Sequence, residues 1–364
     1  MSRRKRRYEN RKKNREKKKE YIKQFDNFDN VTSLDALFRS AKSASKGVSW
    51  KASVQKYLIN IFFRIWRTRK DLIEGKDVRK GFIKFDINER GKTRHIQSVH
   101  FEERVVQKSL CLNVIYPVFS RKLIYDNYAS QKGKGTHFAL VRLEKLLRKF
   151  IRKNGTDGYV LIIDFKNYFG NINHEKMKEI YYETFEDKKL INLSFDFIDA
   201  FGDVGLGLGS ETSQVNAITF LTKLDYYIKN NFKFYGKYMD DSFIFHKNKD
   251  VLKNFLKEIT EKFEEMGVVI NTKKTRIIKL KRGFIFLKTR FFVTDTGKII
   301  KKPCRCAITR ERRKLKRQAR LFKNGDLTID EVRQSYESWK GSMKYKNARK
   351  SVYSMEKLYK KIFS

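Results

Sequence analysis

One short segment constrains the fold of this chain more than any other. The segment Tyr238-Met239-Asp240-Asp241 connects two runs of strand-forming residues, 232–238 and 242–245. The runs predict a hairpin that carries both aspartates at its tip. Adjacent side chains of a strand point to opposite faces, so Asp240 and Asp241 can serve one site only through a sharp turn. The pattern therefore predicts a tight turn built to present carboxylates.

A third carboxylate follows another predicted strand. Tyr159–Ile163 is an apolar run of strand length, and Asp164 comes directly after it. A charge at the end of a buried strand is costly unless it is paired or bound to a metal ion. Mg²⁺ prefers oxygen ligands from a few carboxylates. We therefore expect Asp164, Asp240 and Asp241 to be catalytic and to hold two Mg²⁺ ions, with Mn²⁺ as a substitute.

The charge of the chain indicates a polyanionic partner. Lys and Arg number 84 against 41 Asp and Glu, a formal net charge of +43. Twelve Lys/Arg and three Glu lie within residues 1–20, which lack apolar periodicity and are expected to be disordered. Solubility requires far less charge, so nucleic acid is the expected partner, although composition alone also fits a ribosomal-type RNA binder.

The remaining pattern predicts an α+β fold in which an antiparallel sheet is backed by helices. Hairpins are expected at 80–98, turning at 88–91, and at 268–280. No apolar run reaches the ~18 residues of a membrane span, and no signal peptide is evident, so a soluble, cytoplasmic protein is expected. Cys304 and Cys306 form a lone C-x-C without a second ligand pair, which argues against zinc. Helical spacing is found over the segments 34–75, 101–118, 136–152, 174–184, 249–266 and from 307 onwards.

Taken together, these motifs resemble those of bacterial reverse transcriptases from about residue 80 to the C-terminus. The sequence is similar to the four palm motifs of that family at 159–174, 205–214, 237–245 and 270–275, to the fingers motifs at 94–110 and 125–137, and to the primer-grip strands at 283–292. The resemblance implies an RNA-directed DNA polymerase with a right-hand fold. Its parts would be a basic tail (1–20), fingers with N-terminal helices (21–158), a palm (159–282), and a primer grip with a helical thumb (283–364).

The resemblance also implies roles around the nucleotide. The carbonyl of Phe165 would complete one metal shell, and Phe169 matches the aromatic steric gate that collides with a ribose 2′-hydroxyl. That match disfavours an RNA-dependent RNA polymerase, although Phe169 could instead be a core aromatic. Arg94 matches the fingers arginine that clamps the triphosphate, because guanidinium donors form a planar fork. Lys84 is a weaker second candidate, Lys274 matches the lysine near the leaving pyrophosphate, and Gln214 belongs to the second palm motif.

Further cations match positions that contact the nucleic-acid backbone. They are Lys132 and Lys134 in a glycine-rich loop, Lys288 in the primer grip, and Arg312, Arg313, Lys316 and Arg317 on the first thumb helix. A solvated surface position is the alternative for Arg94, Lys84 and Lys274. Trp339 is better explained by a thumb core than by base stacking.

Two positions depart from the commonest pattern of the family. Leu208 stands where many retroelement enzymes carry a glutamine, and Lys288 stands where the primer grip usually has glycine. An aliphatic residue followed by Gly-x-x-x-Ser-Gln resembles diversity-generating retroelements and the unknown-group, defence-associated enzymes. The loss of an amide at Leu208 removes a directional contact and predicts low fidelity.

Three functions follow as hypotheses. The first is a reverse transcriptase that uses dNTPs to copy a dedicated noncoding RNA into cDNA in anti-phage defence. The second is a diversity-generating enzyme that makes mutagenised cDNA beside an accessory protein. The third is a catalytically silent RNA-binding scaffold, which the three aspartates argue against. No RNase H cluster or HNH pattern is present, so host nucleases or a fixed RNA partner are expected, and a homo-oligomer is an option.

Overall fold

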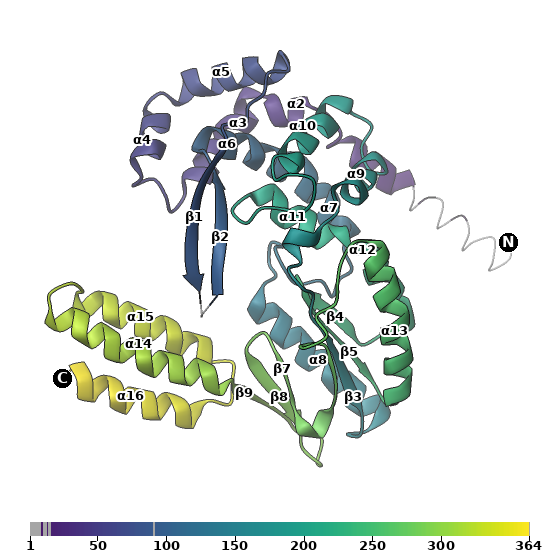
Figure 1. The fold of residues 1–364 in the computed structure, drawn as a ribbon, viewed down its shortest axis with the longest axis vertical. Coiled ribbons are helices and arrows are strands. Elements are labelled where there is room, and N and C mark those ends of the chain that lie inside the picture. The colour runs from purple at the N-terminus through teal and green to yellow at the C-terminus, as the bar shows by residue number, and fades with distance from the viewer. Residues whose placement is uncertain (1–8, 10–12, 14–15, 90–91, 364) are drawn as a thin grey trace. The chain divides into compact units, whose positions relative to one another are not determined.

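The computed structural model describes residues 9, 13, 16–89 and 92–363, and the chain divides into two compact units (Figure 1). The first unit comprises segments 1–132, 165–228 and 259–270, and the second comprises 133–164, 229–258 and 271–364. No helix in the described part of the chain is both long enough and apolar enough to cross a membrane.

The N-terminal part of the first unit is helical, as the spacing predicts. Residues 16–23, part of which falls in the tail expected to be disordered, also lie in a helix. Ser33 caps the helix Leu34–Ser45 by accepting a hydrogen bond from the backbone nitrogen of Ala36 at 3.3 Å. The buried side chains Leu37, Tyr57, Ile61, Ile65 and Val105 form the core of this part. The helices are α2 (Asp29–Thr32), α3 (Leu34–Ser45), α4 (Ala52–Ile59), α5 (Ile61–Ile73) and α6 (Phe101–Leu110).

The predicted hairpin at 80–98 is confirmed as an antiparallel ribbon, β1 (Phe82–Glu89) and β2 (Lys92–Val99). Residues 90 and 91, in the expected turn, lie outside the described residues. Helix α6 continues through a π-helical turn, Cys111–Ile115, into α7 (Tyr116–Lys122). The remaining elements are a 3₁₀ turn (Phe169–Asn171), α9 (His174–Tyr182), α10 (Lys188–Asp199) and α11 (Glu211–Phe220); α12 (Thr222–Asn231) and α13 (Lys249–Glu265) have residues in both units.

A four-stranded antiparallel sheet forms the centre of the second unit. Its strand order is β4-β5-β3-β6, with β3 at Tyr159–Ile163, β4 at Tyr235–Tyr238, β5 at Asp241–His246 and β6 at Arg276–Lys279. Helix α8 (Thr136–Asn154) packs on it with apolar residues at helical spacing, and its Phe150 ring meets the Phe245 ring at a centroid distance of 6.0 Å.

The hairpin predicted at 268–280 is wrong. Residues 276–279 pair with β3 rather than with a strand of their own segment, while Ile270 forms an isolated bridge with Phe165. The segment does contain one strand, but this strand pairs with the edge of β3. Two strand boundaries also differ from the predicted ones: β4 begins at Tyr235 rather than at residue 232, and β5 begins at Asp241 rather than at residue 242.

The C-terminal part of the second unit contains a three-stranded sheet and three helices, α14, α15 and α16, that lie side by side (Figure 1). The helices enclose Leu315, Tyr336 and Met355, with Trp339 packed against them, so Trp339 is confirmed as a core residue. Thr328 and Glu331 form a capping box at the start of α15. The elements are β7 (Phe284–Phe286), β8 (Thr289–Val293), β9 (Ile299–Pro303), α14 (Arg305–Lys323), α15 (Ile329–Met343) and α16 (Arg349–Phe363).

Candidate functional site

A two-residue turn presents the first pair of carboxylates. Tyr238 pairs with Asp241 across Met239 and Asp240, which makes Asp240 the tip of the hairpin and Asp241 the first residue of β5. Met239 adopts a φ of 56°, a region that residues other than glycine seldom occupy. Such strain costs on the order of 1–3 kcal/mol and persists only where the surrounding structure enforces it. The turn is therefore held in shape by the sheet below it.

The strand registers bring Asp164 to the same edge of the sheet. Ile163 pairs with Ser242, so the next position, Asp164, stands opposite Asp241. On the other side of β3, Ile162 pairs with Arg276 of β6. If this register is extended by two residues, Asp164 stands opposite Lys274. Directly opposite Cα atoms in an antiparallel pair lie ~4.5–5.5 Å apart and their side chains share a face. The sheet thus gathers the three predicted aspartates and Lys274.

Asp164 is the most tightly held of the three. The Lys274 ammonium donates to Oδ1 at 2.8 Å and to Oδ2 at 2.7 Å, and the Asn271 amide donates to Oδ1 at 2.9 Å. The Asn271 backbone nitrogen also donates to the Asp164 carbonyl at 2.8 Å. The Asp164 side chain is only 8% exposed whereas that of Lys274 is 53% exposed. The hydrogen bond to Asp164 raises the pKa of Lys274, so the pair is an ion pair at neutral pH.

The other two carboxylates repel each other in a partly buried site. Burial, with the charges of Asp240 and Asp164 added, raises the pKa of Asp241 to about 7. Burial and the charge of Asp164 also raise the pKa of Asp240, while Lys274 and Lys237 act in the opposite direction. Crowded carboxylates of this kind call for a cation.

The donor set suits a magnesium ion. All the donors are carboxylate oxygens, which hard divalent cations prefer over nitrogen or sulfur. Within the described residues, no group of three or more His, Cys, Asp or Glu side chains is already arranged around a metal-sized space. The Lys274 ammonium contacts both oxygens of Asp164 and supplies the positive charge there.

Sequence reasoning missed two residues of this site. Asn271 belongs to the same motif as Lys274, but only the fold shows that its amide and its backbone both contact Asp164. Lys237 directly precedes Tyr238 and is 2% exposed, and its charge lowers the pKa of Asp240. A lysine at a buried position of a strand next to the carboxylate turn was the available signal.

The predicted steric gate lies in the first unit. Phe169 is half-buried at the start of the 3₁₀ turn, whereas its neighbour Tyr168 is buried and donates its hydroxyl to the Ala217 carbonyl at 2.7 Å. The buried aromatics of this segment are Phe165 and Tyr168, and the half-buried ring of Phe169 meets the Tyr168 ring edge-on at a centroid distance of 6.1 Å. The Phe169 carbonyl accepts a hydrogen bond from the backbone nitrogen of Leu206 at 2.7 Å.

The second palm motif is held by close backbone contacts. Gly205 has a φ of 91°, and a Cβ there would lie 2.9 Å from the Gly170 carbonyl oxygen. Further along, the Leu208 carbonyl accepts from the backbone nitrogen of Gln97 on β2 at 3.1 Å. A side chain at Gly205 would therefore prevent the close approach to the Phe169–Asn171 turn, while the Leu208 carbonyl separately connects the motif to the fingers ribbon.

The two predicted phosphate cations of the fingers ribbon lie on opposite faces. The register pairs Arg94 with Ile87 and Lys84 with Gln97. Partners across a ladder share a face, and successive residues alternate, so a ligand on the Arg94 face does not meet Lys84. Both side chains are exposed. Arg94 remains the predicted triphosphate ligand, and Lys84 can act only elsewhere.

Gln214 connects the second palm motif to the glycine-rich loop. Its Oε1 accepts from the Ser130 hydroxyl at 3.3 Å, and Ser130 has a φ of 48°. In the same loop the Lys132 backbone nitrogen donates to the Tyr116 hydroxyl at 2.6 Å. Lys134 lies in the second unit, where its ammonium is 6.0 Å from the Phe138 ring centroid.

The structure brings two of the predicted backbone contacts together in the second unit. Lys288 and Arg312 line one cavity of about 1240 Å³ between the β7–β9 sheet and the thumb helices. Neither Asp nor Glu is among the described residues that line it. Arg313, Lys316 and Arg317 are exposed on α14 but do not line this cavity. Its cations are Lys288, Arg290, Lys302, Arg305, Arg312, Arg349 and Lys350.

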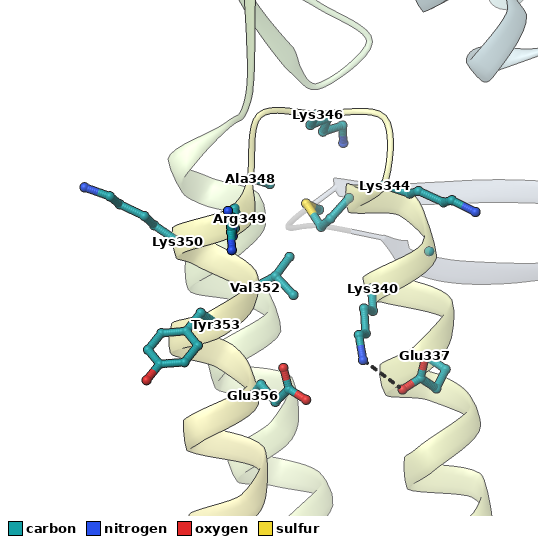
Figure 2. Close-up of a pocket in the computed structure, with 12 residues that line it drawn as sticks. Glu337, Lys340, Lys344, Lys346, Ala348, Arg349, Lys350, Val352, Tyr353 and Glu356 are labelled. Atoms are coloured by element: carbon teal, nitrogen blue, oxygen red, sulfur yellow. Dashed lines mark ion pairs between the residues drawn. The ribbon is translucent and has the colours of Figure 1, made fainter.

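A second cavity of about 1000 Å³ lies between α15 and α16 (Figure 2). It shares Arg349 and Lys350 with the first cavity but also contains Glu337 and Glu356. Glu337 pairs with Lys340 at 3.6 Å, as Figure 2 shows. Because its cations are partly neutralised, this cavity is the weaker of the two as a phosphate site.

Comparisons with known proteins agree with these motifs. The sequence profile of the family described as reverse transcriptase (RNA-dependent DNA polymerase) matches residues 78–312. The solved telomerase of Candida albicans, in complex with a fragment of telomeric RNA, is similar in fold, with a TM-score of 0.50 and 12% identity over 68% of this chain and 51% of that one. An apo telomerase of Candida tropicalis truncated from its C-terminal domain has a TM-score of 0.48 and 16% identity over 61% and 55%.

The chain spans about half the length of the solved structures it matches. No curated protein sequence matches it at a significant level. The predicted α+β right-hand polymerase fold is confirmed. Since the profile covers well over half of its residues, the chain belongs to the reverse transcriptase (RNA-dependent DNA polymerase) family.

Proposed function

We propose that this chain is an RNA-directed DNA polymerase with Asp164, Asp240 and Asp241 as its catalytic centre. The observation that carries the proposal is the convergence of these carboxylates at one edge of the β4-β5-β3-β6 sheet. Two Mg²⁺ ions, or Mn²⁺ in their place, would activate the primer 3′-hydroxyl and stabilise the leaving pyrophosphate when bound. The three carboxylates would hold them, with the carbonyl of Phe165 as a further oxygen.

The other predicted site residues have distinct roles in the proposal. Lys274 neutralises Asp164, and its half-exposed ammonium would also offer positive charge to a triphosphate. Arg94 offers a planar fork of donors to the same triphosphate. Phe169 acts as the wall that a ribose 2′-hydroxyl strikes, so that dNTPs are selected by exclusion. Gln214 positions the glycine-rich loop through Ser130.

The nucleic acid would be bound mainly by phosphate contacts. The cavity around Lys288 and Arg312 concentrates cations, with no Asp or Glu among the described residues that line it, which favours a primer–template backbone. Lys132 and Lys134 in the loop, and Arg313, Lys316 and Arg317 on α14, would extend these contacts. The partners are then a template RNA, the cDNA product and dNTPs.

We further propose that the enzyme is bacterial and cytoplasmic, and that it copies a dedicated noncoding RNA in anti-phage defence. The second palm motif, with Leu208 followed by Gly209 and Ser213-Gln214, supports this group and equally supports a diversity-generating retroelement enzyme. A template/variable repeat pair and an accessory gene beside the coding sequence would favour the latter. An isolated defence cassette would favour the former. An accessory protein or a homo-oligomer is compatible with both.

The test of the catalytic centre is Asp240→Asn. The change removes charge from the metal site but leaves the basic cavity intact, so primer extension should fall by at least about a hundredfold while RNA affinity stays within about threefold. Both are measured on one preparation, with Asp326→Asn, an exposed aspartate, as the matched control. Extension within tenfold of wild type would reject the assignment and leave the silent scaffold as the better function.

A further inference from the structure

Helices α4 and α5 and the residues before them expose several large apolar side chains close together in the sequence. Ile59 is 79% exposed, Phe62 76%, Phe63 61% and Trp66 53%, and Trp50 before α4 is 72% exposed. Single exposed apolar residues are ordinary, but clusters of them mark binding surfaces. All of these residues belong to the first unit and lie away from the carboxylate residues in the sequence.

Helix α5 has two separate apolar faces. Ile61, Ile65 and Leu72 are buried and form part of the N-terminal core. Phe62, Trp66 and Ile73 recur four and seven residues apart, and at 100° per residue they lie about 100° around the helix from the buried face. One apolar face is enough to dock a helix. The outer face, defined here as Phe62, Phe63, Trp66 and Ile73, is therefore available to a partner.

Cations are interleaved with the aromatic rings of the outer face. Arg69 and Lys70 follow Trp66 on the same side of α5, and the Lys70 ammonium lies 5.7 Å from the Trp66 ring centroid. On the neighbouring helix α3, Phe38 stacks on Phe62 at 5.6 Å with an interplanar angle of 11°, and Lys42 lies 5.5 Å from the Phe38 centroid. Residues 34–76 carry ten Lys/Arg against three Asp/Glu, so this aromatic surface is also positive.

We propose that the outer face of α5 is a platform for single-stranded RNA, separate from the catalytic centre. Bases stack on exposed aromatic rings, and nearby Lys and Arg side chains neutralise the phosphates between them. A second copy of this chain would bring the same positive charge to the interface, whereas RNA brings the opposite charge. The platform would hold an unpaired segment of RNA whether or not that segment is being copied, so the inference does not depend on polymerase activity.

The experiment uses the full chain with Phe62, Phe63 and Trp66 each changed to Ala. The matched control changes Tyr182 and Tyr226 to Ala, because these are exposed aromatics (65% and 45%) on other helices of the same unit. Fluorescence anisotropy measures the affinity for a U-rich single strand of about 20 nucleotides and for an RNA duplex of equal length. The triple variant should lose about tenfold or more in single-strand affinity and little in duplex affinity, while the control keeps both.

A second measurement does not depend on the folding of the variant. RNA containing 4-thiouridine is crosslinked to the wild-type chain, and the attached peptides are identified by mass spectrometry. Crosslinks within residues 59–73 support the platform, and their absence overturns it. The proposal is also overturned if the triple variant is folded and binds RNA normally. In that case, loss of self-association in sedimentation would assign the outer face to a second copy of the chain, and loss of binding to anionic vesicles would assign it to a membrane surface. If neither property changes, the outer face binds none of these partners.

Discussion

At the scale of single residues, Phe169 shows how the structure distinguishes two neighbouring residues of one motif. The sequence contains two adjacent aromatics, and only the fold shows that Tyr168 is the buried one, tied to Ala217 through its hydroxyl. Phe169 is half-buried and fixed through its carbonyl by Leu206. The backbone is therefore held, while the half-buried ring packs edge-on against Tyr168.

Changing Phe169 to Ala tests that difference. If the ring excludes a 2′-hydroxyl, the variant should incorporate ribonucleotides about tenfold or more better relative to deoxynucleotides, since each ~1.4 kcal/mol of lost discrimination is a factor of ten. Competitive single-nucleotide extension gives the ratio. Tyr168→Phe is the control, because it removes a core hydrogen bond and should lower stability without changing sugar selection. An unaltered ratio in Phe169→Ala would show that the ring is not the gate.

Lys288 is the second residue whose role depends on backbone geometry. Leu287 and Lys288 form the two-residue turn between β7 and β8, with φ of 44° and 60°. Turns of this kind favour Asn or Gly because an L side chain is strained in the left-handed region. The lysine is retained at a position that is locally unfavourable for it, and its ammonium lines the basic cavity.

Lys288→Gly should separate these two effects. Relief of strain should stabilise the protein by about 1 kcal/mol, while loss of the cation should weaken RNA binding and reduce its log–log salt slope by ~0.7–0.9. Thermal unfolding and a salt titration of binding measure the two quantities. Lys257→Gln, which neutralises an exposed lysine on α13, is the charge control. A variant that gains stability without losing affinity would remove Lys288 from the nucleic-acid interface.

At the scale of elements, α14 combines a basic outer surface with an unusual buried acid. Glu311 is 7% exposed, and its Oε1 has no hydrogen-bond partner within the described residues. Burial raises the pKa of Glu311, although Lys314 acts in the opposite direction. The folded state therefore binds the proton more tightly than the unfolded state, so stability is lost as the pH rises from the unfolded value toward the raised folded value.

Glu311→Gln should remove that loss. The variant should unfold a few degrees higher than wild type near pH 8, and the difference should shrink near pH 5, because lowering the pH favours the protonated form of the wild-type carboxyl. Glu337→Gln on α15, an exposed partner of Lys340, should change stability by less than ~0.5 kcal/mol at either pH. An equal gain from Glu311→Gln at both pH values would show that ionisation is not the cause.

At the scale of the whole molecule, positive charge occurs both in the helices and in residues 1–20. Deleting residues 1–20 should weaken RNA affinity equally for all sequences and flatten the salt dependence, because a segment without apolar periodicity can only neutralise phosphates. Changing Arg312, Arg313, Lys316 and Arg317 to Gln should in addition shorten extension products, because α14 is expected to follow the primer–template duplex. A salt titration and a processivity assay on both variants measure this. Loss of synthesis on tail deletion with normal extension by the α14 variant would reverse these roles.

The sequence by itself determined the polymerase family, the three carboxylates of the proposed catalytic centre and most of the helices. Those features depend on local periodicity and on residue types at fixed spacing, both of which are readable along the chain. The tertiary structure decided which strands pair and which side chains contact one another. Residues 276–279 join the edge of β3, Asn271 and Lys274 both hold Asp164, and Lys84 turns away from Arg94. Which strands pair, and in which register, depends on contacts between residues far apart in the chain, and a difference of one residue in register exchanges the two faces of a strand.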